Sequence, residues 1–488
     1  MHLLIENCAL LTPDASQGYE TGRYIAIKGN TIEAITDRRP DGDFDQVLSG
    51  HNRLAIPGLI NAHTHSPENF MRGTAEQLPL EPWLAQLIAI SGAYSPRDHY
   101  LSAMVGAIEM IRTGVTAVLD HFWSTTDSPE ILSAAMQAYE DSGLRAAIAP
   151  LYRDAQLDVD SGIERGHPLD ETFYGGQYSN FFLPWPDRLQ LLETFFERWH
   201  GAAGGRLRCM VGPSGVQWST EMLLQESLAL ARRYHSGFHM HLLETRVQDW
   251  SCRQHFGSSA VQWLAERELL GPEMSLSHAV WLTDTDLEFI AKAGAGIVHN
   301  PVANLKLGSG LAPVPAMLSL GVPVALGTDG AASNDNQVLF EAIRLAALIH
   351  NSPETDPRLW ISARQALQMV TEGGAYVLGL EGRLGKIEPG YLADITLLDL
   401  SSPHLFPMNE AYRQLVYCDV GRSVRTVIVD GMVLMNEGRI EVFNEQAILA
   451  EAREAVTERL YRHPKLPQEV QADIEKFIDF SRDIILNT

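Results

Sequence analysis

The sequence is short of cysteine and of positive charge, and it contains no long hydrophobic run. Its four cysteines are scattered over 488 residues without a Cys-x-x-Cys pair, so no disulfide framework is indicated. Lysine and arginine number 37 against 61 aspartates and glutamates, a formal net charge of −24. This excludes the basic face that nucleic acids and anionic membranes attract. No window of about 18 apolar residues occurs, so no transmembrane helix is expected.

Targeting and cofactor motifs are also missing. Residues 1–6 carry no basic region and no long apolar core, so we expect no signal peptide and a cytoplasmic protein. No Gly-x-Gly-x-x-Gly follows a predicted strand, which argues against a dinucleotide-binding sheet. No Gly-x-Ser-x-Gly elbow is present, which argues against a Ser-His-Asp hydrolase. The hydrophobic content of 45% is that of an ordinary globular protein.

The middle of the chain alternates between short apolar runs and amphipathic stretches such as 100–111 and 221–234. Eight strand–helix units in one region predict an α/β fold, a (β/α)8 TIM-type barrel, in preference to a doubly wound open sheet. The eight runs are 57–62, 115–120, 145–151, 207–213, 238–242, 274–278, 295–299 and 322–327.

Both ends of the chain show strand patterns with turn signals, which predicts a small β-sandwich domain built from the two termini. The aromatic-rich segment 154–187 interrupts the barrel and is expected to be either a lid or an oligomer interface. The predicted domains are 1–56 (β-sandwich, first part), 57–382 (hydrolase barrel), 383–443 (β-sandwich, second part) and 444–488 (helical segment).

Histidines stand where several predicted barrel strands end. His63 and His65 point the same way from one strand, and a metal ion satisfies both rings at once. At the fifth strand, parity does not choose between His239 and His241. Glu244 follows closely, and hydrolysis needs such a carboxylate to move a proton beside a metal-bound imidazole.

Two further polar residues end later strands of the same barrel. His278 ends the sixth strand, and Asp329 ends the eighth, where it offers a hard oxygen ligand and a base. Each alone is compatible with an ordinary structural role, His278 as a core histidine and Asp329 as a helix cap. Because all these groups fall at C-terminal strand ends of one barrel, they are expected to meet in one site.

These stretches resemble the amidohydrolase superfamily over the whole chain. The branch they resemble holds S-adenosylhomocysteine/methylthioadenosine deaminases, 8-oxoguanine-type deaminases and triazine aminohydrolases or chlorohydrolases. The resemblance is carried by Pro-Gly-Leu-Ile-Asn-Ala-His-Thr-His at 57–65, Arg-Gly at 72–73, and the stretches 241–244, 277–279, 299–308, 327–334 and 385–394.

The resemblance implies one divalent metal ion per chain, zinc or alternatively iron, held by His63, His65, His241 and Asp329. It implies that Glu244 shuttles the proton, with Asp329 also accepting one, and that His278 hydrogen-bonds the attacking water or the substrate. His239 has no role in that pattern. The fourth strand lacks the lysine of binuclear members, so the site is expected to be mononuclear. Relatives of this kind imply a homo-oligomer, a dimer or larger.

The expected reaction is hydrolytic deamination of a small aminated N-heteroaromatic compound of purine, pterin, pyrimidine or triazine type, using metal-activated water. The alternatives are a chlorohydrolase or a urea, amide or thiocarbamate hydrolase. An inactive scaffold is disfavoured because no ligand is missing.

Adenosine-type deaminases have a His-Ser-Pro step where this chain has Pro213-Ser214-Gly215. They also have a substrate-binding arginine just after the third strand, where this chain has Pro150, with Arg153 close by. Both departures disfavour S-adenosylhomocysteine.

An aromatic-lined pocket would suit a flat ring. Gly330, directly after Asp329, is the deaminase-like choice. The substrate-binding candidates are Trp83, His121, Trp123, Gln217, Trp218 and Asn304.

Overall fold

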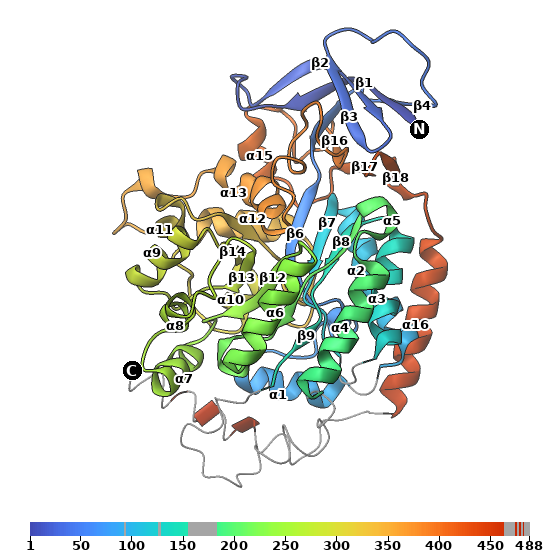
Figure 1. The fold of residues 1–488 in the computed structure, drawn as a ribbon. Coiled ribbons are helices and arrows are strands. Elements are labelled where there is room, and N and C mark those ends of the chain that lie inside the picture. Colours follow the sequence, from blue (N-terminus) through green and yellow to red (C-terminus); the bar gives the residue numbers. More distant parts are fainter. Residues whose placement is uncertain are drawn as a thin grey trace.

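The structure is a computed structural model, and it describes residues 1–91, 94–124, 128–154, 183–462, 474, 475, 478, 479 and 482. Figure 1 shows a helix-covered body of parallel strands with a separate sheet at one end, where the N-terminal strands lie. Within the described residues, no helix combines the length and hydropathy needed to cross a bilayer. Most of segment 154–187, predicted as a lid or an interface, lies outside the described residues.

Eight parallel strands follow the predicted runs in order. The first four-stranded sheet has the order β10-β8-β7-β6, and the second has the order β12-β13-β14-β15. Their bounds are β6 (Leu59–Thr64), β7 (Val115–Asp120), β8 (Arg145–Ile148), β10 (Leu207–Cys209), β12 (Phe238–Leu242), β13 (Met274–His278), β14 (Gly296–His299) and β15 (Val324–Leu326). The short parallel strands β9 (Leu151–Tyr152) and β11 (Gly212–Pro213) form a separate two-stranded sheet. The predicted alternation of strands and helices is confirmed.

The barrel prediction requires one closed eight-stranded sheet. Among the described residues, the eight strands are instead assigned to two four-stranded sheets. At one seam, parallel bridges join Val211 to Phe238 and Gly215 to His241. At the other, the Asp329 amide donates to the His63 carbonyl over 2.9 Å. Because β10 and β15 are only three residues long, few backbone groups are available for a continuous ladder at the seams.

Several of the helices between the strands start at a residue whose side chain caps them. The helix α2 (Pro96–Arg112) begins after Ser95, which forms a capping box with Asp98, and α6 (Glu221–Arg233) is capped by Thr220. The helix α2 contains the predicted stretch 100–111, and α6 matches the predicted stretch 221–234 to within one residue. The others are α1 (Leu80–Ser91), α3 (Pro129–Ser142), α4 (Trp185–Trp199), α5 (Ala202–Gly205), α7 (Arg246–Phe256), α8 (Ala260–Glu266), α9 (Asp284–Ala293), α10 (Pro301–Lys306), α11 (Val314–Ser319), α12 (Leu339–Leu348), α13 (Ala363–Met369), α14 (Glu372–Val377), α15 (Ala411–Tyr417) and α16 (Glu445–Arg462). Short 3-10 helices span Ser66–Phe70, Val216–Trp218 and Pro357–Leu359.

The two chain ends share one nine-stranded sheet, in which β5 pairs with β16 antiparallel. The two packed layers of the predicted sandwich are not assigned among the described residues, because these strands form one continuous sheet. Its strands are β1 (His2–Leu11), β2 (Tyr19–Lys28), β3 (Thr31–Thr36), β4 (Gln46–Ser49), β5 (Arg53–Pro57), β16 (Ile395–Asp399), β17 (Val424–Val429), β18 (Met432–Asn436) and β19 (Arg439–Ile440).

A buried ion-pair network ties this sheet to the parallel strands. Arg145, at the start of β8, donates to Asp394 over 3.0 Å and to Asp430 over 2.8 Å. Arg145 and Asp394 are both almost fully buried. The carboxylates raise the pKa of Arg145 against the opposing effect of burial, so the guanidinium stays charged. On the outer surface, α16 contacts α2 through the pairs Arg97–Glu451 and Arg112–Glu445.

Candidate active site

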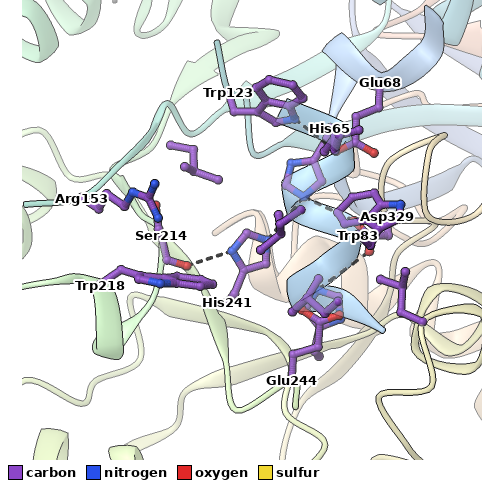
Figure 2. Close-up of a pocket in the computed structure, with 16 residues that line it drawn as sticks. His65, Glu68, Trp83, Trp123, Arg153, Ser214, Trp218, His241, Glu244 and Asp329 are labelled. Atoms are coloured by element: carbon purple, nitrogen blue, oxygen red, sulfur yellow. Dashed lines mark hydrogen bonds and ion pairs between the residues drawn. The ribbon is translucent and has the colours of Figure 1, made fainter. Parts of the chain in front are cut away.

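The predicted metal ligands meet where strands of both four-stranded sheets end. His63 and His65 come from the end of β6, His241 from β12, His278 from β13, and Asp329 from the loop after β15. All of them except the fully buried His63 line a cavity whose wall also carries aromatic and aliphatic side chains, as Figure 2 shows. The cavity is lined by His65, Glu68, Leu80, Trp83, Leu84, Leu87, Trp123, Leu151, Arg153, Ser214, Trp218, His241, Glu244, His278, Leu307 and Asp329.

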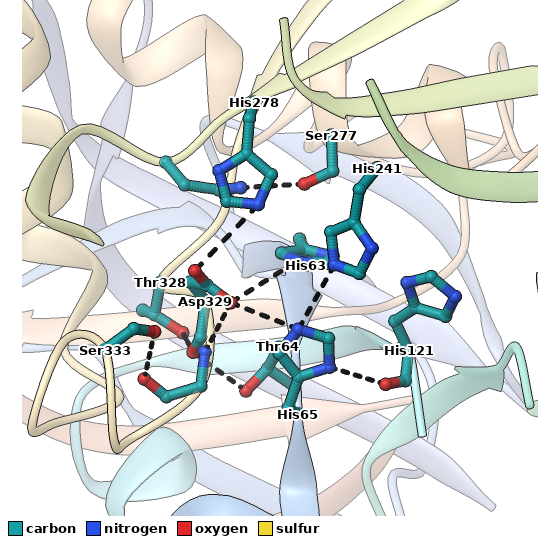
Figure 3. A network of polar contacts seen from close by, with 12 residues as sticks. His63, Thr64, His65, His121, His241, Ser277, His278, Thr328, Asp329 and Ser333 are labelled. Carbon is teal, nitrogen blue, oxygen red and sulfur yellow. Dashed lines mark hydrogen bonds and ion pairs between the residues drawn. The ribbon is translucent and has the colours of Figure 1, made fainter. Parts of the chain in front are cut away.

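The distances between the candidate ligand atoms suit a tetrahedral ion. His65 Nε2 lies 3.4 Å from His241 Nε2 and 3.3 Å from Asp329 Oδ1. His63 Nε2 lies 3.4 Å from the same Asp329 oxygen, and Figure 3 shows the four side chains converging. Ligands about 2.0–2.1 Å from a tetrahedral zinc are about 3.3–3.4 Å apart. Three of the six distances among these four ligand atoms therefore match a tetrahedral coordination shell.

Hydrogen bonds behind two of the rings orient them toward the centre. The Nδ1 of His65 donates to the His121 carbonyl over 2.6 Å, and that of His241 donates to the Ser214 carbonyl over 2.8 Å. Since a carbonyl only accepts, each ring carries its proton on Nδ1 and presents the Nε2 lone pair to the other ligands. This is the tautomer that a metal ion requires.

The third ring is held by another histidine. His63 Nδ1 lies 2.8 Å from His239 Nε2, and His239 Nδ1 lies 2.5 Å from the Ser275 hydroxyl. The buried Nε2 of His63 has no hydrogen-bond partner among the described residues. Such an atom costs free energy unless something binds it, and an ion at the centre would do so. His239 thus orients His63 through a hydrogen bond. The predicted pattern gives His239 no role as a metal ligand.

The ionisation of the rings fits the same reading. Burial lowers the pKa of the His63 and His241 imidazoles well below their ordinary value, and neighbouring histidines lower it further. Neutral imidazole is the form that binds metals. For His65, burial acts downward, but the carboxylates of Glu68 and Asp329 outweigh it and raise the pKa. The centre therefore attracts positive charge.

Glu244 and His278 lie side by side at the edge of the ligand set. The Oε1 of Glu244 is 3.6 Å from His278 Nδ1 and accepts from the Ser309 hydroxyl over 3.3 Å. Burial raises the pKa of Glu244 well above its ordinary value, and Asp329 adds to this effect. His278 Nε2 lies 4.0 Å from Asp329 Oδ2. A buried carboxyl with a raised pKa beside the centre is suited to accepting a proton and passing it on.

The backbone at these positions is strained. His278 and Asp329 have φ values of 72° and 65°, in the left-handed region that non-glycine residues avoid. Strained residues of this kind gather at functional sites, where the surrounding structure holds them in place. Here the strain places both side chains toward the cavity.

The six predicted substrate contacts divide into two groups. Trp83, Trp123 and Trp218 line the cavity. The other three are not among the described residues that line the cavity. His121 Nε2 donates to the Gly212 carbonyl over 3.2 Å, Asn304 Oδ1 accepts from His278 Nδ1 over 2.8 Å, and Gln217 is buried. That His121, Gln217 and Asn304 contact the substrate stays a prediction, because strand-end position alone does not decide whether a side chain lines the cavity.

Glu68 is the functional candidate that sequence reasoning missed. It lies on the 3-10 helix Ser66–Phe70, is buried, and lines the cavity beside His65. Its carboxylate accepts from Trp123 Nε1 over 3.1 Å and from the Ala332 amide over 3.2 Å. Burial raises its pKa to about 7, against the lowering effect of His65. The available signal was a carboxylate three residues after His65, a predicted metal ligand. Arg153, named above as near Pro150, also lines the cavity.

Comparison with known proteins assigns the family. A model of the amidohydrolase family matches residues 54–434, and the chain belongs to this family. It is 32% identical over 457 residues to a 5-methylthioadenosine/S-adenosylhomocysteine deaminase of Syntrophomonas wolfei, covering 93% of this chain and 98% of the relative. It is 34% identical over 461 residues to a 5'-deoxyadenosine deaminase of Methanosarcina mazei, covering 94% and 99%.

Solved structures share the fold over nearly the whole chain. A triazine hydrolase from Arthrobacter aurescens superposes with a TM-score of 0.84 at 26% identity, covering 93% of this chain and 99% of the other. The zinc complex of an atrazine chlorohydrolase from Arthrobacter aurescens TC1 gives 0.84 at 25% identity, covering 93% and 100%. The predicted family is therefore confirmed, and the protein is a metal-dependent hydrolase that acts on C–N bonds.

Proposed function

We propose that this protein is a mononuclear hydrolytic deaminase that removes an amino group from an N-heteroaromatic ring. The observation that carries the proposal is the set of four ligand atoms at tetrahedral spacing, with the carboxyl of Glu244 at its edge. The nearby relatives named as deaminases of adenosine-type compounds support the reaction class.

Each residue has a defined task in this proposal. One divalent ion, zinc in preference to iron, would be held by His63, His65, His241 and Asp329. When bound, such an ion acidifies a water molecule and polarises the atom under attack. Glu244 takes a proton from the water side and delivers it to the departing nitrogen, which leaves as ammonia. His278 donates its Nδ1 proton to Asn304 Oδ1, so its Nε2 would accept a hydrogen bond from the attacking water or the substrate.

The walls of the cavity favour a flat, largely apolar ring. Trp83, Trp123 and Trp218 provide aromatic faces, and several leucines complete the lining. Such a pocket gains free energy by burying a planar heterocycle, while a few polar groups fix its orientation. Purines, pterins, pyrimidines and triazines all meet this description.

A panel experiment tests the proposal. Zinc-loaded enzyme is incubated with aminated purines, nucleosides, pterins, pyrimidines and triazines, and ammonia release is measured. We expect ammonia from at least one class, in equimolar amount with the hydroxylated or oxo product. Absence of ammonia across the whole panel, with the metal in place, would reject the deaminase assignment.

A second candidate is hydrolysis of another bond on the same scaffold. The likeness to a triazine hydrolase and an atrazine chlorohydrolase favours testing chlorinated triazines, and ureas, amides and thiocarbamates follow the same chemistry. The product distinguishes the cases, because deamination releases ammonia, dechlorination releases chloride, and amide or urea cleavage releases a larger amine.

We also propose how the sheets close, how the chain divides into domains, where the protein is located and that it is an oligomer. The two four-stranded sheets close into a (β/α)8 barrel at 57–382, and the terminal sheet folds over as a β-sandwich of 1–56 and 383–443, with 444–488 as a helical appendage. The bridges at one seam and the hydrogen bond at the other support closure. A cytoplasmic homo-oligomer, a dimer or larger, remains the expectation from the sequence.

A further inference from the structure

Glu68 is a buried carboxyl of the cavity wall that the deaminase chemistry above does not use. Figure 2 shows it on one side of His65 and Asp329, while Glu244 lies on the other. Two N–H groups already bind it, one to each oxygen, from Trp123 and Ala332. A carboxylate has about four acceptor positions, so capacity remains on the side that faces the cavity.

The chain makes room for this carboxyl at a specific position. A Cβ added to Gly330 would collide with the Glu68 carboxylate, so no larger residue fits after Asp329 while Glu68 keeps its place. Trp123 also stands against it, with its ring in the cavity wall. Glu68 is thus held in one orientation, as a group that recognises a ligand must be.

The charges around the cavity decide what such a group would bind. Among the described lining residues, the carboxyls of Glu68, Glu244 and Asp329 outnumber the single arginine, Arg153. With Asp329 given to the ion and Glu244 to proton transfer, Glu68 is the carboxylate left for the substrate. A fixed carboxylate between apolar walls favours a partner with N–H donors or a positive charge.

We propose that Glu68 is a specificity-determining residue that binds an N–H-rich or cationic edge of the substrate, an amidine-like N–C–N group, beside the metal centre. The inference rests on the proposed function in that it names the substrate class of the same site. It predicts that a ring carrying a further amino group or a protonated ring nitrogen is preferred over a ring that presents only acceptors there.

The test uses two flat probes of nearly the same shape. Benzamidinium carries the cationic N–C–N group, and benzamide is its neutral counterpart. Binding of each to the zinc-loaded enzyme is measured by titration calorimetry, for the wild type and for Glu68→Gln, Glu68→Asp and Asp120→Asn. Asp120→Asn is the matched control, since Asp120 is an equally buried carboxyl near His65 that bonds Ser66 and Tyr139 but does not line the cavity.

We expect the wild type to bind benzamidinium at least about tenfold more tightly than benzamide, the factor typical of a hydrogen bond to a charged group. Glu68→Gln should remove that preference without changing benzamide binding, Glu68→Asp should weaken it partly, and Asp120→Asn should keep it. Equal wild-type affinities for the two probes would overturn the inference whether or not any variant folds. Equal weakening of both probes by Glu68→Gln would also overturn it, because that is the result of a purely structural role.

The two proposals fail separately. Probe binding needs no turnover, so discrimination that depends on Glu68 supports this inference even if no ammonia is released from the panel. Ammonia release without such discrimination supports the deaminase and rejects the role of Glu68.

Discussion

Glu244 is the residue on which the proton-transfer argument depends. It is buried against His278 and lies outside the group of four candidate ligands, so its chemistry is separable from metal binding. A glutamine of the same shape keeps the packing but neither carries nor delivers the proton.

Glu244→Gln should therefore lose turnover and keep the metal. We expect kcat to fall by about 10²–10⁴, the usual contribution of general acid–base catalysis, with the metal content and thermal stability of the wild type. Steady-state kinetics on the best panel substrate, together with metal analysis, measures both. Wild-type turnover in this variant would show that another group moves the proton.

His299 provides a pH prediction. It is fully buried at the end of β14, neither ring nitrogen has a partner among the described residues, and burial lowers its pKa to about 3. In the unfolded chain His299 binds a proton near pH 6.5, whereas in the folded chain it does so only near pH 3. The contribution of neutral His299 to stability is therefore fully present above pH 6.5 and is lost as the pH falls toward 3. The loss is about 1.4 kcal/mol per pH unit below 6.5.

His299→Leu should remove this contribution. Thermal unfolding between pH 7.5 and 5.0 should show a smaller decline for the variant than for the wild type, a difference of about 2 kcal/mol at pH 5.0. Parallel declines in the two proteins would mean that His299 titrates normally in the folded state.

At the scale of elements, hydrophobic periodicity accounts for most of what the sequence could predict. Three predicted runs, 115–120, 238–242 and 274–278, coincide with β7, β12 and β13, because a buried parallel strand is rich in apolar residues and bounded by polar turns. The run 145–151 splits into β8 and β9, since irregular backbone between them is as apolar as the strands. Periodicity does not detect such breaks.

The residues of the site also divide into those that the sequence could predict and those that it could not. The proposed metal ligands and Glu244 were predictable because they stand at strand ends, whose position in the fold follows from topology. Glu68 was not, because its place depends on how the turn after β6 folds back against Trp123 and Gly330. His121 and Asn304 follow predicted strands, yet neither lines the cavity, and only packing decides that placement.

At the scale of the molecule, buried polar contacts join the chain ends to the parallel strands, in addition to a shared hydrophobic core. The central one is Arg145 with Asp394 and Asp430. Removal of one partner of a buried ion pair leaves an uncompensated charge in a medium that solvates it poorly.

Arg145→Met should lower the free energy of unfolding by about 3–5 kcal/mol, because Asp394 is then buried alone. Thermal denaturation of the metal-loaded protein measures the effect. Addition of Asp394→Asn should restore part of the loss, since no lone charge is left. If Arg145→Met is as stable as the wild type, the network does not couple the sheet to the strands.

The metal content of the purified protein tests the central claim most directly. Elemental analysis after dialysis against zinc should give one divalent ion per chain for the wild type and well below half an ion for Asp329→Ala, with activity following occupancy. A wild-type protein that retains no metal after zinc loading, or an Asp329→Ala variant that retains a full ion, would contradict the account.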